Sequence, residues 1–266
     1  MNDEPAQTTD EAAETNARRR GIYLLPNLFT TGTLFAGFYA IVAAMTGRFE
    51  AAAVAIFVAM LMDGLDGRVA RLTNTASDFG VQYDSLADLV AFGLAPALVM
   101  YQWGFQGMVD MGWLWAKLGW IGAFFYTVAA ALRLARFNVR AGSDDKRFFQ
   151  GLPSPSAAAV VAGTVWVGAD MGWAGSDLSI PAYIITVLMG ALMVSNLGYY
   201  SFKDLNMTGR VRFSYVLIVP LLFILVASAP AQMLFGIFFL YAVSGPVWSV
   251  WRWNKRRRQR HTATGE

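Results

Sequence analysis

The sequence has no cysteine and a single histidine, His261, close to its C-terminal end. It therefore can form neither a disulfide nor a thiolate metal site, and it has no cysteine nucleophile. Charged residues are also scarce, at 15% of the chain, whereas soluble domains contain about 25%. With 56% hydrophobic residues, the chain has too little polar surface to enclose a soluble core. These absences leave a helical membrane bundle as the fold class, and they leave acid–base chemistry to carboxylates, Lys or Tyr.

Apolar segments recur from residue 22 onwards. Each is near the roughly 20 residues that a helix needs to cross a bilayer, and none alternates like a barrel strand. We therefore expect an all-α, polytopic transmembrane bundle of about eight helices, with six to eight possible. The expected spans are 22–46, 51–72, 79–102, 113–136, 155–173, 179–199, 212–228 and 230–251.

Lys and Arg are unevenly distributed between the loops. If the N-terminus is cytoplasmic, all but two of the 21 basic residues lie on the cytoplasmic side, and the exceptions are Arg48 and Lys117. The positive-inside rule then predicts that both termini face the cytoplasm, with the chain in the inner (cytoplasmic) membrane. We expect the basic run 255–260 to flank the last span and attract anionic lipid, not to bind nucleic acid.

The composition divides the chain into four parts. Residues 1–16 carry acids and no base, which predicts a disordered cytoplasmic tail over 1–20. A transmembrane core follows over 21–200, then additional transmembrane helices over 201–252. A basic cytoplasmic tail occupies 253–266.

Four aspartates interrupt the second and third expected spans: Asp63, Asp66, Asp84 and Asp88. A carboxylate near the centre of a span costs roughly 2.5–3.5 kcal/mol on an insertion scale, so such residues are usually functional. Their spacings place each pair on one helix face, and a turn near 72–78 brings the two faces together at the cytoplasmic side. Carboxylates this close need cations to stay ionised. Oxygen ligands select Mg²⁺, Mn²⁺ or Ca²⁺, and two such ions would suit phosphoryl transfer.

Glycines accompany these acids. Gly64, Gly67 and Gly80 lie in helical stretches, where glycine costs about 1 kcal/mol relative to alanine but lets a ligand or a neighbouring backbone come close. Arg71 follows one turn after Gly67 and could bind a diphosphate. Together these residues favour a nucleotide-diphosphate substrate. The alternatives are an acid cluster that only pairs with Arg68 or Arg71, and glycines that only permit helix packing.

The pattern Asp63-x2-Asp66-Gly67-x2-Ala70-Arg71-x8-Gly80-x3-Asp84-x3-Asp88 resembles the signature of the CDP-alcohol phosphotransferases. The resemblance covers most of residues 22–200. It implies a homodimeric integral membrane enzyme that moves a phosphatidyl or similar group from a CDP-linked donor to an alcohol and releases CMP. It also implies that the first three of the four aspartates bind metal, and that Asp88 faces the metal and acts as the base. The residues that resemble donor contacts are Gly67, Ala70, Arg71, Ser77 and Gly80, with Asn27 at the start of the first helix as a further one.

The wider sequence resembles the bacterial phosphatidylserine synthases within that family, through the stretches 25–30, 82–88, 133–138 and 151–155. This resemblance implies CDP-diacylglycerol and L-serine as substrates. Arg133 and Arg136 lie three residues apart, and Arg can bind a carboxylate with two hydrogen bonds. We expect both, with Asn138, to form the serine site, although the two arginines could be ordinary membrane anchors. Pro153 to Pro155 should begin the fifth helix.

Other acceptors remain open at this point. Glycerol 3-phosphate, inositol phosphate or choline could serve the same core chemistry. A divalent-cation transporter that uses the acids as an ion site is a remote alternative. It is disfavoured because the acids lie at one membrane face and the motif does not recur in the second half of the chain.

Overall fold

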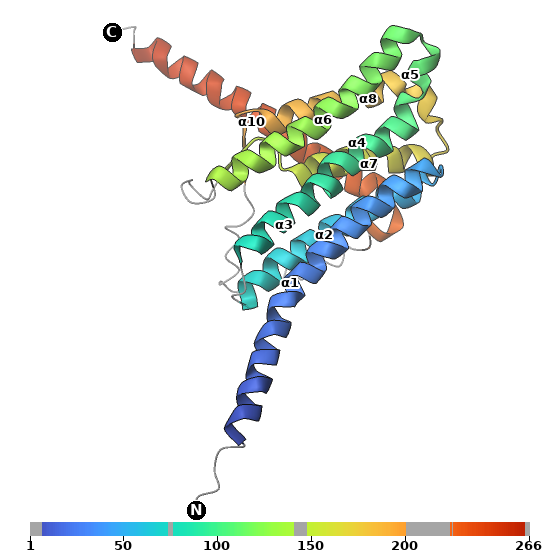
Figure 1. Ribbon diagram of the computed structural model, residues 1–266. Helices are drawn as coiled ribbons and strands as arrows, with labels where there is room; N and C mark the ends of the chain where they lie inside the picture. The colour runs from blue at the N-terminus through green and yellow to red at the C-terminus, as the bar shows by residue number, and fades with distance from the viewer. Residues whose placement is uncertain (1–6, 74–76, 141–147, 201–223, 225, 264–266) are drawn as a thin grey trace, which may run out of the picture.

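The computed structural model describes residues 7–73, 77–140, 148–200, 224 and 226–263. Helices build almost all of this part of the chain and form a bundle (Figure 1). They are α1 (Gln7–Met45), α2 (Phe49–Thr73), α3 (Asp78–Asp88), α4 (Ala95–Met100), α5 (Gly107–Asp110), α6 (Trp113–Arg140), α7 (Ser154–Asp170), α8 (Ser179–Val194) and α10 (Pro230–Ala263). The predicted all-α bundle is therefore confirmed.

Five of the helical segments are long and apolar enough to cross a membrane. They are Pro26–Met45, Asp78–Phe105, Trp113–Val139, Gly175–Val194 and Pro230–Ser249. Two further expected spans, 51–72 and 155–173, correspond to α2 and α7. The expected span 212–228 lies largely outside the described residues.

Helix α1 begins at Gln7, so it includes residues 7–20 of the segment that was expected to be a cytoplasmic tail. This segment is rich in Ala, Glu and Arg, which are strong helix formers. It also continues directly into a membrane-length helix, so no separate nucleation step is needed. One consequence is that Asn27, which was expected at the start of the first helix, lies well inside it.

The third expected span is one continuous rod with two π-helical stretches. After α3, residues Leu89–Leu94 form the π-helix η1, and after α4, residues Tyr101–Phe105 form η2. Two carbonyls of η1 accept hydrogen bonds from α6: the Tyr126 hydroxyl lies 3.1 Å from the Phe92 oxygen, and Thr127 Oγ1 lies 3.5 Å from that of Gly93. Helix α6 is thus fixed against the segment that follows Asp88.

A short antiparallel strand pair departs from the helical pattern. Strand β1 (Phe148–Gln150) pairs with β2 (Gly198–Tyr200), with Phe149 opposite Tyr199. The expected helix 179–199 therefore stops at Val194, because Ser195 is extended. The chain leaves β1 through Gly151, whose φ of +81° suits glycine and whose amide donates to the Leu197 carbonyl at 2.8 Å.

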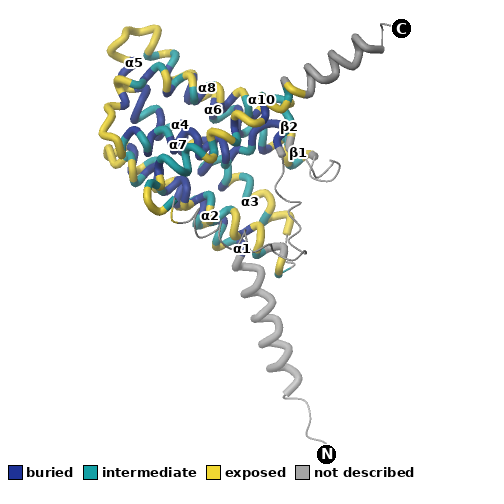
Figure 2. Tube along the Cα trace, turned by 180° about the vertical axis from the view of Figure 1, so that it is seen from behind, coloured by how far each residue is buried: buried dark blue, intermediate teal, exposed yellow. Residues whose placement is uncertain are grey.

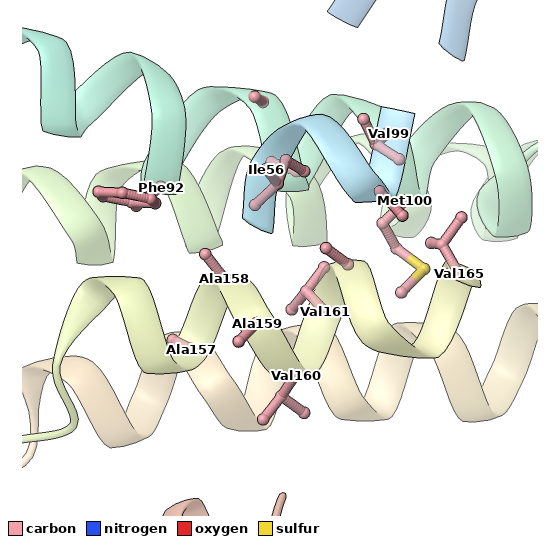
Figure 3. Close-up of a cluster of buried hydrophobic side chains, with 14 of the residues drawn as sticks. Ile56, Phe92, Val99, Met100, Ala157, Ala158, Ala159, Val160, Val161 and Val165 are labelled. Atoms are coloured by element: carbon pink, nitrogen blue, oxygen red, sulfur yellow. The ribbon is translucent and has the colours of Figure 1, made fainter. Parts of the chain in front are cut away.

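The core lies around α7, which is buried along most of its length. Figure 2 shows this burial where α4 and α7 lie in the middle of the bundle. In Figure 3, Ala158 and Val161 of α7 point toward Ile56, Phe92 and Met100. Helices α1 and α2 pack against each other, and both contribute buried alanines to the core: Ala36, Ala40, Ala43 and Ala44 on one helix, and Ala52, Ala53, Ala55 and Ala59 on the other. Such small side chains let the two backbones approach closely.

Candidate active site

The predicted acid cluster forms between the C-terminal halves of α2 and α3. Asp63 and Asp66 lie in the last three turns of α2, and Asp84 lies in the second half of α3. One carboxylate oxygen of each lies within 4.8 Å of the other two. Opposite ligands of one Mg²⁺ or Ca²⁺ ion are separated by roughly 4–5 Å, so the three carboxylates fit a divalent cation.

Asp88 completes the cluster from the last residue of α3. Its carboxylate interacts electrostatically with Asp63, Asp84 and Asp66, and also with Arg133. In the described part of the chain, its Oδ1 atom is buried and has no hydrogen-bond partner. A buried carboxylate oxygen without a partner is costly, and a bound cation or a substrate hydroxyl would satisfy it. Four acids beside one guanidinium leave excess negative charge, which divalent cations would balance.

Asp66 is the most enclosed member of the cluster, with 5% of its surface exposed. The Thr30 hydroxyl of α1 donates to Asp66 Oδ2 at 3.0 Å. The first helix therefore supports the acid cluster directly, in addition to packing against α2 and α3.

The predicted donor contacts gather beside the cluster, at the start of α3. Ser77 caps this helix, since its Oγ accepts from the Gly80 amide at 3.0 Å. A Cβ on Gly80 would lie 3.2 Å from Ser77 Oγ and 3.5 Å from Asn27 Oδ1. The three residues thus share one small polar region. Helix α2 also contains Ala70 and Arg71, but their side chains lie outside the described residues.

Gly67 lies one turn after Asp63 on the same face of α2. Among the described residues, no atom lies within 4 Å of the place that a Cβ would take there. The described part of the chain therefore leaves space next to this glycine, where a substrate is expected to approach.

Two residues of the predicted serine site, Arg133 and Arg136, lie in different places. Arg133 of α6 donates to Ser154 Oγ at 2.6 Å and interacts electrostatically with Asp88 and Asp63, so it belongs to the acid site. Arg136 lies instead beside the strand pair, where its Nη2 donates to the side chains of Gln150 and Asn196.

Asn138, the third predicted member, contacts α3. Its Nδ2 donates to Ser85 Oγ at 2.8 Å. Ser85 directly follows Asp84, so this bond ties the end of α6 to the helix that carries two of the acids.

Three hydroxyl residues of the site were not among the predicted site residues: Thr30, Ser85 and Ser154. Only Ser154 had a possible role, within the stretch 153–155 that could shape the acceptor pocket. The partners of the three residues lie 36, 53 and 21 residues away in the chain, so no local spacing links each pair. The available signal was weak, because each residue belongs to a stretch that resembles the phosphatidylserine synthases without belonging to the aspartate motif.

A family model for CDP-alcohol phosphatidyltransferases matches residues 23–248. The chain belongs to this family. Three relatives carry the name CDP-diacylglycerol–serine O-phosphatidyltransferase. The protein from Helicobacter pylori is 34% identical over 222 residues, which cover 84% of this chain and 90% of the relative. The Mycobacterium leprae protein is 29% identical over 264 residues, or 92% and 84% of the two chains. The Saccharomyces cerevisiae protein is 39% identical over 146 residues, half of each chain.

Proposed function

We propose that this CDP-alcohol phosphatidyltransferase transfers the phosphatidyl group of CDP-diacylglycerol to the hydroxyl of L-serine, giving phosphatidylserine and CMP. Family membership supports the reaction class, and the names of the relatives support serine as the acceptor. The observation that carries the proposal is the unpartnered buried oxygen of Asp88, which lies among three other acids and beside Arg133. This is the arrangement that a proton acceptor next to a bound carboxylate substrate requires.

The donor would lie across the ends of α2 and α3. Asn27, Ser77 and Gly80 supply polar atoms and space for the CDP moiety, and Gly67 leaves room for the chain of phosphates. Arg71 is expected to bind the diphosphate. Asp63, Asp66 and Asp84, with Asp88 at the edge, would hold two divalent cations. When bound, these ions would neutralise the diphosphate and stabilise the negative charge of the departing CMP.

The acceptor would approach from the side of α6. Arg133 is charged, partly enclosed and held by Ser154, so it can bind the serine carboxylate and orient the molecule. Asp88 then accepts the proton of the serine hydroxyl. The serine oxygen forms a bond to the phosphorus that carries diacylglycerol, and the bond from that phosphorus to the CMP oxygen breaks. One displacement gives both products, and no covalent enzyme intermediate is required.

We also propose an inner-membrane location, a cytoplasmic active site and a homodimer that interacts with anionic lipids. The support for the orientation is the distribution of Lys and Arg. The five membrane-length helices support a multi-pass protein.

An acceptor panel tests the proposed function. The purified protein in lipid nanodiscs receives CDP-diacylglycerol, Mg²⁺ or Mn²⁺, and one acceptor at a time: L-serine, glycerol 3-phosphate, inositol phosphate or choline. We expect CMP release with L-serine and not with the other three acceptors. Faster release with another acceptor would reject serine as the natural substrate while preserving the reaction class.

The Asp88→Asn variant tests the base. We expect its turnover to fall by about 10²- to 10⁴-fold, the usual contribution of a general base. Asp110→Asn, at an exposed position of α5, is the matched control and should retain activity. Normal turnover by the Asp88→Asn variant would show that another group takes the proton.

A further inference from the structure

Thr30 stands out among the residues around the acid cluster because it belongs to neither the aspartate motif nor the predicted substrate contacts. It is 4% exposed and lies on α1, whereas the acids lie on α2 and α3. Its hydroxyl donates a hydrogen bond to the carboxylate of Asp66. Of the three aspartates whose oxygens could share a metal ion, Asp63, Asp66 and Asp84, Asp66 is the least exposed.

The Thr30 hydroxyl has two acceptors within reach and one proton to give. Pro26 carbonyl oxygen lies 3.2 Å away, and Asp66 Oδ2 lies 3.0 Å away. Inside an α-helix, that carbonyl already accepts from the backbone amide four residues later. The carboxylate is the stronger acceptor because it is charged. The proton therefore goes to Asp66.

The position of Thr30 is fixed by the packing of its helix. Figure 1 shows α2 lying beside the C-terminal half of α1, and both helices contribute buried alanines to the core. A second hydroxyl link lies one turn further along: Thr33 Oγ1 is 3.2 Å from the Phe29 carbonyl oxygen and 3.5 Å from that of Ala59. Thr30 thus presents its hydroxyl to Asp66 from a rigid support.

We propose that Thr30 is a positioning residue for the metal centre. Its hydrogen bond holds one lone pair of Asp66 Oδ2 and so fixes the carboxylate plane. The Gly67 backbone is a second hydrogen-bond partner of this carboxylate, and the lone pairs that neither partner uses are left for the space shared with Asp63 and Asp84. Partners of this kind commonly change metal affinity by about 10- to 100-fold. The inference rests on one part of the proposed function, the binding of divalent metal by the aspartates. It does not depend on which alcohol is the acceptor.

The test measures Mn²⁺ binding without either substrate. The wild-type protein and its variants, in nanodiscs, are titrated with Mn²⁺, and the free ion is followed by electron paramagnetic resonance. We expect Thr30→Val, which keeps the side-chain shape but lacks the hydroxyl, to raise the dissociation constant about 10-fold or more. Thr30→Ser restores the hydroxyl and should bind close to wild type.

Thr33→Val is the matched control. Thr33 is equally buried, at 1% exposed, lies on the same helix and also loses a hydroxyl, but its acceptors are backbone carbonyls. Its Mn²⁺ affinity should equal that of the wild type even if its thermal stability falls. A second readout is the Mn²⁺ concentration for half-maximal CMP release. It should rise for Thr30→Val, and saturating Mn²⁺ should recover most of the rate.

Two outcomes would overturn the role of Thr30: unchanged Mn²⁺ affinity in Thr30→Val, or an equal loss in Thr33→Val. Asp66→Asn separates this failure from a failure of the metal centre. If the wild type binds Mn²⁺ and Asp66→Asn does not, the metal centre is supported, and the Thr30→Val result then tests the role of Thr30 alone. If the wild type does not bind Mn²⁺ at all, both the centre and the role of Thr30 are rejected.

Discussion

Replacing Gly67 by alanine should separate stability from activity. No atom of the described residues lies within 4 Å of the position that the new methyl group would occupy, so this part of the fold accepts it without strain. Gly67 lies inside α2, where alanine is favoured over glycine by about 0.5–1 kcal/mol. We therefore expect the free energy of unfolding to rise, and the midpoint of thermal unfolding to increase by roughly 1–4 °C.

Activity should change in the opposite direction. The methyl group would enter space on the face of α2 that carries Asp63, where the donor diphosphate is expected to lie. Forcing a methyl group into a well-filled site costs about 1–3 kcal/mol. The value of kcat/KM for CDP-diacylglycerol, measured at saturating serine, should therefore fall by about 5- to 150-fold, while KM for serine changes little.

Gly236→Ala provides the control. Gly236 lies in α10, and a Cβ at this position would likewise meet no atom of the described chain within 4 Å, but the residue is remote in sequence from the aspartate motif. The free energy of unfolding of the Gly236→Ala variant should rise by the same amount, and the variant should keep full activity. If Gly67→Ala is stabilised and fully active, the open space beside Gly67 does not receive the donor, and the reasoning is refuted.

Two further predictions concern the surroundings of the site. Ser154→Ala removes the hydroxyl that accepts a hydrogen bond from Arg133. Because a hydrogen bond to a charged group is worth about 1.5–3 kcal/mol, KM for serine should rise about 10- to 100-fold in steady-state assays. An equal rise in KM for CDP-diacylglycerol would contradict a role confined to the acceptor. Gly151→Ala combines a φ of +81° with a Cβ 2.3 Å from the Met193 carbonyl oxygen, and its unfolding midpoint should fall. Gly47→Ala has a similar φ of +74° but no close neighbour among the residues that the structure describes, and its unfolding midpoint should fall clearly less. Equal losses would show that the Met193 contact is unimportant.

The acid site could be predicted from the sequence because its signal is local. Apolar segments rarely contain aspartate, so Asp63, Asp66, Asp84 and Asp88 were recognisable, and helical spacing placed each pair on one face. The turn between the two segments is short, which brought the pairs together without any knowledge of the rest of the fold. For the same reason both limits of α2 and the first residue of α3 agree with the expected spans to within a few residues.

Features that depend on distant partners could not be predicted in this way. The amide oxygens that bind Arg136 come from positions 14 and 60 residues further along the chain. The spacing of Arg133 and Arg136, on which the predicted serine site was based, contains no information about these partners. Strands of three residues are too short for an alternating pattern to be visible. The helical state of residues 7–20 was missed because an acidic, polar composition is typical both of disorder and of a solvated helix.

The π-helical stretch between Asp88 and Ala95 has a consequence for how this segment can change in evolution. Neighbouring residues of an α-helix differ by about 100° in direction, so one residue added or removed between these positions would rotate the carboxylates of Asp84 and Asp88 away from α2 while the following turns stayed in the core. A π turn is itself equivalent to an extra residue in an α-helix. The length of the segment Leu89–Leu94 is therefore under stronger constraint than its side chains, and homologous enzymes should vary there by substitution and not by insertion or deletion.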